Sequence, residues 1–171
     1  MWFRHDLRIT DNPALNEACR SGDIIPIYIQ DNHNNEGKQI GSASKWWLHQ
    51  SLISLNKDLD GGLITLTGDP KKIIPKLVNE SGASSVVWNR NYEPWQITRD
   101  KNIKTKLEEN GLKVKTFNGS LLWEPWKILN QSGTPYKVFT PFYRKGCLNA
   151  DSPRIPEAKP KKINVVTLND G

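Results

Sequence analysis

Three loops carry the polar side chains best suited to hold a small ligand. Each comes after a short apolar segment, and together they cover residues 4–12, 31–34 and 89–93. Arginine side chains bind anionic groups, and an aromatic side chain can stack on a flat ring. These residue types indicate a flat, polar-edged, partly anionic ligand. Ion pairing within the loops, for instance between Asp6 and Arg8, is the alternative explanation.

The sequence lacks the residue patterns that several other kinds of chemistry require. The sequence has neither a G-x-x-x-x-G-K-[ST] phosphate loop, nor G-x-G-x-x-G after the first strand, nor a G-x-S-x-G nucleophile turn. His5, His33 and His49 are scattered, and Cys19 and Cys147 are too few for a disulfide framework or a four-thiolate zinc site. The motifs therefore predict neither a metal site nor a set of catalytic residues.

Short apolar strands and longer helices alternate up to residue 117. Runs of β-branched residues predict strands buried on both faces, and proline at a first turn or glycine after a last turn predicts the helix ends. The pattern predicts an α/β fold: a Rossmann-like, doubly wound parallel sheet with helices on both faces, which binds ligands at the carboxyl ends of its strands. The expected strands are Trp2–Phe3, Ile24–Ile29, Leu63–Leu66, Val86–Trp88 and Leu112–Phe117, and the expected helices are Pro13–Arg20, Ala43–Leu59, Pro70–Ser81 and Pro94–Asn110.

Tryptophan is abundant, with seven residues in the chain. Trp46 and Trp47 are neighbours on an expected helix, so they cannot share one face. We expect one to pack on the sheet and the other to face the ligand cleft or a partner surface. After residue 117 the sequence is irregular, and short helices are expected over 120–131 and 141–148.

The net charge of +6 comes mostly from the end of the chain. Residues 127–171 hold eight basic and three acidic side chains, whereas the preceding residues are nearly balanced. A Pro/Lys-rich segment of this kind predicts a solvated linker, with a nucleic-acid contact as the alternative. The length of 171 residues fits one ordinary domain. No apolar run is long enough to span a membrane, which indicates a cytoplasmic protein.

Several motifs in sequence resemble those of one protein family. The first residues, MWFRHDLRITDNPAL, resemble the opening of DNA photolyases and cryptochromes. Further similar segments follow in the family's order: SKWWLHQSL, LTGDP, VVWNRNYEPWQITRD, FNGSLLWEPW and GTPYKVFTPFYRKG. The likeness covers about residues 1–150, and the motifs are most similar to those of class I cyclobutane pyrimidine dimer photolyases.

The resemblance implies that residues 1–131 form the family's N-terminal α/β domain, whose five-stranded parallel sheet has the order 3-2-1-4-5. Residues 132–171 would then begin the connector to a second domain. In the family, the first domain holds an antenna chromophore: methenyltetrahydrofolate, an 8-hydroxy-deazaflavin or flavin mononucleotide (FMN). This chromophore absorbs light and passes the energy to reduced FAD in a later helical domain, where damaged DNA is repaired.

The whole protein is then expected to be a deoxyribodipyrimidine photo-lyase, a carbon-carbon lyase, while the present chain alone is not expected to be catalytic. Its expected partners are the FAD-binding helical domain and, through the full-length protein, damaged DNA. A module of a cryptochrome-type blue-light sensor is the alternative function. A stand-alone nucleotide-binding protein is a third, which would need the phosphate loop that the sequence lacks.

The resemblance also assigns antenna-binding residues. The folate type uses an Asn-Glu pair at the positions of Trp95 and Gln96, so this departure favours an 8-hydroxy-deazaflavin or FMN over methenyltetrahydrofolate. His5 replaces an arginine of the family, and a neutral imidazole cannot form the two-pronged bond of a guanidinium. The expected chromophore-binding residues are Arg4, His5, Asp6, Leu7, Asp31, Asn32, Lys45, Asn91, Tyr92 and Glu93.

Overall fold

The computed structural model describes residues 1–31, 40–166 and 168. The chain divides into two compact units, which are described separately. The first unit comprises residues 1–119 together with the chain from residue 157 onward, and the second comprises residues 120–156. The boundary predicted after residue 131 lies inside the second unit.

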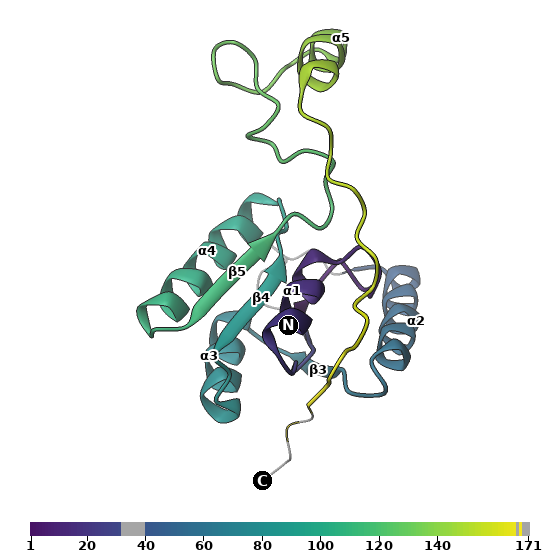
Figure 1. The fold of residues 1–171 in the computed structure, drawn as a ribbon, viewed down its shortest axis with the longest axis vertical. Helices are drawn as coiled ribbons and strands as arrows, with labels where there is room; N and C mark the ends of the chain where they lie inside the picture. The colour runs from purple at the N-terminus through teal and green to yellow at the C-terminus, as the bar shows by residue number, and fades with distance from the viewer. Residues whose placement is uncertain (32–39, 167, 169–171) are drawn as a thin grey trace. The chain divides into compact units, whose positions relative to one another are not determined.

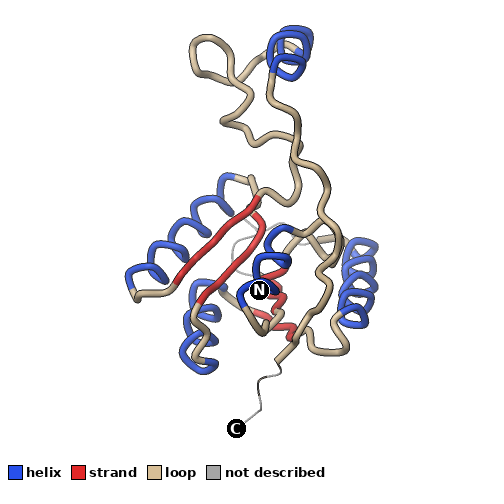
Figure 2. The backbone as a smooth tube through the Cα atoms, in the orientation of Figure 1, coloured by secondary structure: helices blue, strands red, loops and turns tan. Residues whose placement is uncertain are grey.

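The first unit alternates strands and helices, as the sequence predicts (Figures 1 and 2). Each helix after the first strand begins close to a proline or a small polar residue. Asn12, for example, accepts a hydrogen bond from the Leu15 amide at 3.0 Å and so caps the first helix. The elements are β1 (Trp2–Phe3), α1 (Pro13–Ser21), β2 (Ile27–Gln30), α2 (Ser42–Asp58), β3 (Ile64–Thr67), α3 (Pro70–Ser81), β4 (Ser85–Asn89), α4 (Pro94–Glu109) and β5 (Lys113–Phe117).

The strands form two parallel sheets, one of β1, β2 and β3 and the other of β4 and β5. The single sheet expected from the order 3-2-1-4-5 would need a ladder between β1 and β4, and none joins them in the described residues. β1 has only two residues, and the next amide, that of Arg4, donates to Asp6 Oδ1 at 2.8 Å instead. The Trp2 and Trp88 rings nevertheless meet edge to face, 5.7 Å apart, so the two strands are neighbours.

Helices cover both faces of the strands. On one face, α3 and α4 pack against Trp2, Val86 and Trp88. On the other, α1 and the end of α2 pack against Phe3 and Val87. Successive strand residues point to opposite faces, which is why Trp2 and Phe3 belong to different cores. Each fully buried apolar side chain of this size contributes about 1.5–3 kcal/mol.

The helix α2 differs from the other helices because it is mostly exposed. Within it only Leu55 is buried, and Leu59 follows at its end. Trp46 and Trp47 are 61% and 69% exposed, so neither packs on the sheet as expected for one of them. Leucines recur at positions 48, 52, 55 and 59 and predict one apolar stripe along this helix, but only its C-terminal end is buried, where Leu55 and Leu59 join the core.

The last residues of the first unit pack along its surface. Asn164 accepts a hydrogen bond from the Ile24 amide at 2.8 Å, and Val165 forms a parallel bridge with Ile24. Asn16 donates to a carboxylate oxygen of Glu157 at 2.5 Å. The end of the chain is therefore not wholly a solvated linker, because these contacts fix parts of it against the core.

The second unit, residues 120–156, has little regular structure. The helix expected over 120–131 is absent from this described segment, because Pro125 in its middle cannot donate a backbone hydrogen bond. A short helix expected over 141–148 is found as consecutive turns of α, π and 3-10 helix, α5 (Phe139–Pro141), η1 (Phe142–Gly146) and η2 (Cys147–Asn149). Within the unit, the Phe139 and Tyr143 rings stack 5.9 Å apart.

Candidate functional site

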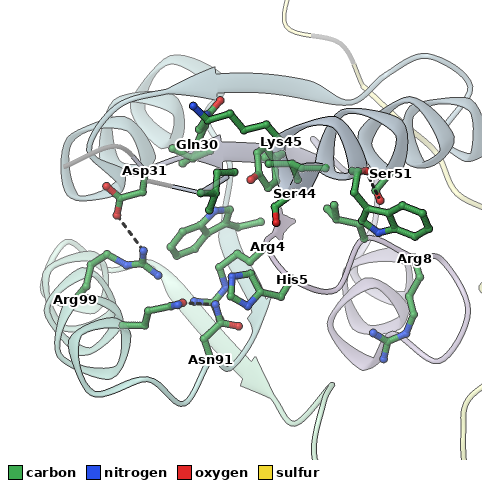
Figure 3. Close-up of a pocket in the computed structure, with 18 of the residues that line it drawn as sticks. Arg4, His5, Arg8, Gln30, Asp31, Ser44, Lys45, Ser51, Asn91 and Arg99 are labelled. Carbon is green, nitrogen blue, oxygen red and sulfur yellow. Dashed lines mark hydrogen bonds and ion pairs between the residues drawn. The ribbon is translucent and has the colours of Figure 1, made fainter. Parts of the chain in front are cut away.

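A cavity of about 1230 Å³ lies at the carboxyl ends of β1 and β2. Figure 3 shows Lys45, Ser44 and Ser51 on one side, across from Asn91, His5 and Arg99. We call the first side the α2 wall: Ala43, Ser44, Lys45, Trp47, Leu48 and Ser51. We call the second side the inner wall: Trp2, Arg4, His5, Asp31, Asn91, Trp95, Gln96 and Arg99.

Behind the inner wall, a buried polar network shapes the loop after β1. Asn89, at the end of β4, donates to Asp6 Oδ2 at 2.5 Å and to Asn12 Oδ1 at 2.7 Å. Asp6 also accepts a hydrogen bond from the Arg4 amide. All of these side chains are almost fully buried. The network holds the loop from Arg4 to Asn12 against β4, which is how this loop comes to line the cavity.

The guanidinium of Arg4 is fixed by two partners. Its Nη1 pairs with Asp100 of α4, and its Nη2 donates to the backbone carbonyl of Asn89. Burial lowers the pKa of Arg4 from its ordinary value, and the nearby Asp100 carboxylate opposes that shift. Arg4 therefore acts first as a structural link between β1, β4 and α4.

Arg99 forms the second buried charge cluster of the inner wall. It donates to Asp31 Oδ2 at 3.0 Å and to Asp100 Oδ1 at 2.7 Å and 2.9 Å. Its guanidinium carbon lies 5.1 Å from the Trp2 ring centre and 5.0 Å from that of Trp95. The end of β2 and the first turns of α4 are thereby joined at the cavity.

The α2 wall presents side chains at helical spacing. Trp47 and Leu48 each lie three or four residues from both Ser44 and Ser51, so all four line the side of the helix that faces the cavity. Lys45 is exposed, and among the described residues none forms a hydrogen bond or ion pair with its ammonium group. This wall therefore offers the cation of Lys45, which no ion pair holds among the described residues, and the exposed ring of Trp47.

The structure brings together six of the ten residues expected to bind the chromophore. Three of the others lie elsewhere: Asp6 is in the buried network, Tyr92 donates to Asn118 at 3.3 Å, and exposed Glu93 precedes α4. Asn32 lies outside the described residues. The six that line the cavity are Arg4, His5, Leu7, Asp31, Lys45 and Asn91.

Sequence reasoning missed several residues of the cavity. Trp95 and Gln96 were considered only as departures from the folate type, yet both line the cavity, and Arg99 lies one turn later at the spacing that places it beside them. Gln96 accepts a hydrogen bond from Asn91, one of the expected residues. Ser44 and Ser51 lie seven residues apart, about two helical turns, so their spacing could likewise have placed them on one face of α2. Tyr28 and Gln30 carried no such signal beyond their place near the end of β2.

Two further properties of the described residues bear on the site. No group of three or more His, Cys, Asp or Glu side chains among them lies close enough together to hold a metal ion. No helix in the described part of the chain is long and apolar enough to cross a membrane.

Comparison with known proteins gives consistent matches. Residues 1–161 match the family described as DNA photolyase. The chain is 42% identical over 167 residues to a deoxyribodipyrimidine photo-lyase from Agrobacterium fabrum, and 36% identical over 171 residues to Cryptochrome-2 from Arabidopsis thaliana. These alignments cover 95% and 98% of this chain but only 34% and 28% of those proteins. The chain thus spans about a third of the length of these relatives.

Solved structures show the same similarity. A bacterial class III photolyase from Agrobacterium tumefaciens has a TM-score of 0.87 and 41% identity, over 96% of this chain and 34% of that one. Its class differs from the class I that the motifs indicated. A photolyase from Sulfolobus tokodaii has a TM-score of 0.75 and 26% identity, over 96% of this chain and 37% of that one. That structure contains two FAD molecules and is described as implying a novel light-harvesting cofactor.

Proposed function

Because this chain belongs to the DNA photolyase family, we propose that it binds a light-harvesting chromophore in the cavity between the inner wall and the α2 wall. The cavity itself is the observation that carries this function. It lies where α/β folds bind ligands, and it combines tryptophan rings with cationic side chains. The Sulfolobus relative supports the idea, since its description connects a second FAD with light harvesting.

Paired and exposed side chains of the cavity contribute differently to binding in this proposal. Arg4 and Arg99 are held by carboxylates and so set the shape and polarity of the inner wall. Lys45 and His5 line the cavity and are exposed, so their side chains can turn toward an anionic group of the chromophore. An exposed lysine attracts anions in a salt-dependent way, so binding should weaken as ionic strength rises.

For the chromophore, we favour an 8-hydroxy-deazaflavin or FMN over methenyltetrahydrofolate. Trp95 and Gln96 stand where the folate type of the family has an Asn-Glu pair, and both line the cavity. Gln96 is already engaged with Asn91, and as an amide it cannot provide the carboxylate of that pair. The binding affinities of all three compounds should be compared to test this preference.

The proposal extends to the full-length protein. Excitation energy would pass to FAD in a helical domain, and that protein would repair damaged DNA in the cytoplasm as a deoxyribodipyrimidine photo-lyase. The present chain would then supply light harvesting and no catalytic residue. In the second unit, Leu122, Val138 and Phe139 are 69%, 62% and 73% exposed, and such apolar residues suit packing against the helical domain.

Titration of the purified chain with each chromophore tests the proposal. We expect at least one of the three to bind, with a change in its absorption band and quenching of tryptophan fluorescence. Lys45→Glu should weaken binding by about tenfold through charge reversal, whereas Lys57→Glu on the same helix, away from the cavity, should not. If none of the three binds above background, the antenna function is wrong.

A cryptochrome-type sensor is the second candidate, and the 36% identity to Cryptochrome-2 is the observation that favours it. The two candidates differ in what the full-length protein does under blue light. Repair of cyclobutane dimers in an oligonucleotide identifies the enzyme. Absence of repair, together with light-dependent reduction of FAD, identifies the sensor.

A further inference from the structure

One loop of the first unit binds both points at which the chain enters and leaves the second unit. These two points are Gly119 and Glu157, and both belong to the first unit. In the loop after β1, Arg8 Nη2 donates to the backbone carbonyl of Gly119 at 2.6 Å. The Asp11 amide donates to the Glu157 carbonyl at 2.9 Å, and Asp11 Oδ1 accepts from the Glu157 amide at 3.1 Å. We call Arg8 and Asp11 the stem clasp.

The two members of the stem clasp support each other and lie against buried neighbours. Arg8 Nη2 also donates to the Asp11 carbonyl at 2.7 Å, so one guanidinium joins both members. Hydrogen bonds from a charged donor are about twice as strong as those between neutral groups. A Cβ atom at Gly119 would lie 2.5 Å from the buried side chain of Asn89, so glycine is what lets the chain pass this close to β4. The first stem is therefore held against the core.

The second unit has little packing of its own. It spans residues 120–156, and a chain below about 40 residues usually needs a disulfide, a metal or a partner to stay folded. Cys147 is its single cysteine, so no disulfide can form within it. Within residues 120–156, all of which the structure describes, only Ile128 and Gly146 are buried. The unit must therefore gain stability from something other than a core of its own.

We propose that the stem clasp keeps the second unit folded by holding its two ends together, as a disulfide would. Ends that are already held together remove the loop-closure cost that the contacts of the unit would otherwise have to overcome. The nearest such contact beyond the stems is the Trp123 indole, which donates to the Asp151 carbonyl at 2.8 Å. Arg8 and Asp11 are thus positioning residues for the unit that carries the exposed apolar side chains. The clasp needs no ligand in the cavity.

The two cysteines of the chain report separately on the two units. Cys19 lies in α1 of the first unit and Cys147 in the second, and each is partly buried. A thiol reagent reacts faster with such a side chain when its unit opens, so the two labelling rates measure local opening in each unit. The whole chain is labelled without denaturant, and peptide mass spectrometry assigns the rate at each cysteine.

Asp11→Gly tests the second stem. The φ of Asp11 is +50°, which glycine adopts freely, so the carboxylate is removed with little change in the backbone. Cys147 should react about tenfold faster, as expected for the loss of a bond that involves a charged group, with little change at Cys19. Asp11→Asn keeps an oxygen acceptor and should restore most of the protection. Asp60→Gly is the matched control, because Asp60 is an exposed aspartate with a φ of +52° in the turn after α2.

Arg8→Gln tests whether the two stems act together. This variant loses the guanidinium that bonds to Gly119 and leaves the hydrogen bonds between Asp11 and Glu157 in place. Cys147 should again react about tenfold faster. If both ends must be held, the double variant Arg8→Gln/Asp11→Gly should react little faster than either single variant. Lys76→Gln, which breaks an exposed ion pair on α3, is the control for the lost charge.

Three results would overturn the proposal. Unchanged labelling of Cys147 in both single variants would show that the second unit stays folded without the clasp. Equal acceleration at Cys19 and Cys147 would show that the variants destabilise the whole chain. Multiplicative effects in the double variant would show two independent anchors. Because no chromophore is added, the outcome is separate from that of the chromophore titration, and either proposal can fail while the other stands.

Discussion

The two walls of the cavity differ in how their side chains are held. On the inner wall, Arg4 and Arg99 are buried and each is bonded to carboxylates and to neighbouring elements. On the α2 wall, Lys45 and Trp47 are exposed, and the helix is attached to the core mainly at its far end, through Leu55 and Leu59. One wall is therefore preorganised and the other adaptable.

This difference follows from the sequence of each segment. The inner wall draws on strand ends and the start of α4, where β1, β2, β4 and α4 converge and bury charge. Buried charges are tolerated only when they are paired, so these residues are interdependent. The α2 wall lies on a helix that has few buried positions, so its residues can change one at a time. Substitutions of the paired inner-wall residues should therefore lower the free energy of unfolding more than substitutions in the α2 wall.

The largest effect is expected for Asp100→Asn. This carboxylate pairs with both Arg4 and Arg99, and its loss would leave two buried guanidinium groups with too few partners. We expect the free energy of unfolding to fall by about 3–5 kcal/mol, measured by urea denaturation. The control is Glu108→Gln on the same helix, whose exposed pair with Lys104 contributes at most about 1 kcal/mol. Equal losses for both variants would contradict a preorganised inner wall.

A somewhat smaller effect is expected where α2 joins the core. Leu55 is 1% exposed, and Leu55→Ala should reduce the free energy of unfolding by about 2–5 kcal/mol through the cavity it creates. Ile53→Ala, on the exposed side of the same helix, should change it by no more than about 0.5 kcal/mol. Both are measured by thermal and urea unfolding. If Ile53→Ala is equally destabilising, α2 is more firmly attached than its exposure indicates.

Much of the fold could be predicted from the sequence, because periodicity and end signals are local. The helix ends expected from the positions of proline and glycine lie within two residues of the observed ends, and α3 begins and ends where expected. The separation into two sheets could not be predicted, because the sequence does not show that the amide following the two-residue β1 donates to Asp6 rather than to a neighbouring strand. The helix expected over 120–131 is absent from the structure, and Pro125 in the middle of that segment cannot donate a helical backbone hydrogen bond.

The candidate site was predictable in outline only. Loops at the carboxyl ends of strands were expected to converge, and Arg4, Asp31 and Asn91 do lie together. Sequence alone could not separate Asp6, which faces Asn12 and the core, from its neighbours, which face the cavity. That distinction depends on long-range packing of the loop against β4.

A pH-dependent effect is expected for Tyr28, which lies in β2 and lines the cavity. Burial raises the pKa of its phenol, so the folded state favours the protonated form. Stability should be unaffected below the pKa of the unfolded chain, about 10, and should fall as pH rises above it. Tyr28→Phe should reduce this alkaline loss in unfolding measured from about pH 8 to about pH 11. A steeper loss in the variant would contradict this assignment.

The smallest effect on stability is expected for Trp47→Ala in the α2 wall. With its side chain 69% exposed, Trp47 buries little surface, and the free energy of unfolding should change by no more than about 0.5 kcal/mol. Trp95→Ala in the inner wall should cost more, because it removes the ring that covers Arg99. Comparing the two by urea denaturation tests whether the walls differ in rigidity, since both residues are tryptophans that line the same cavity. Equal losses would show that exposure does not distinguish them, and the α2 wall would then be as preorganised as the inner wall.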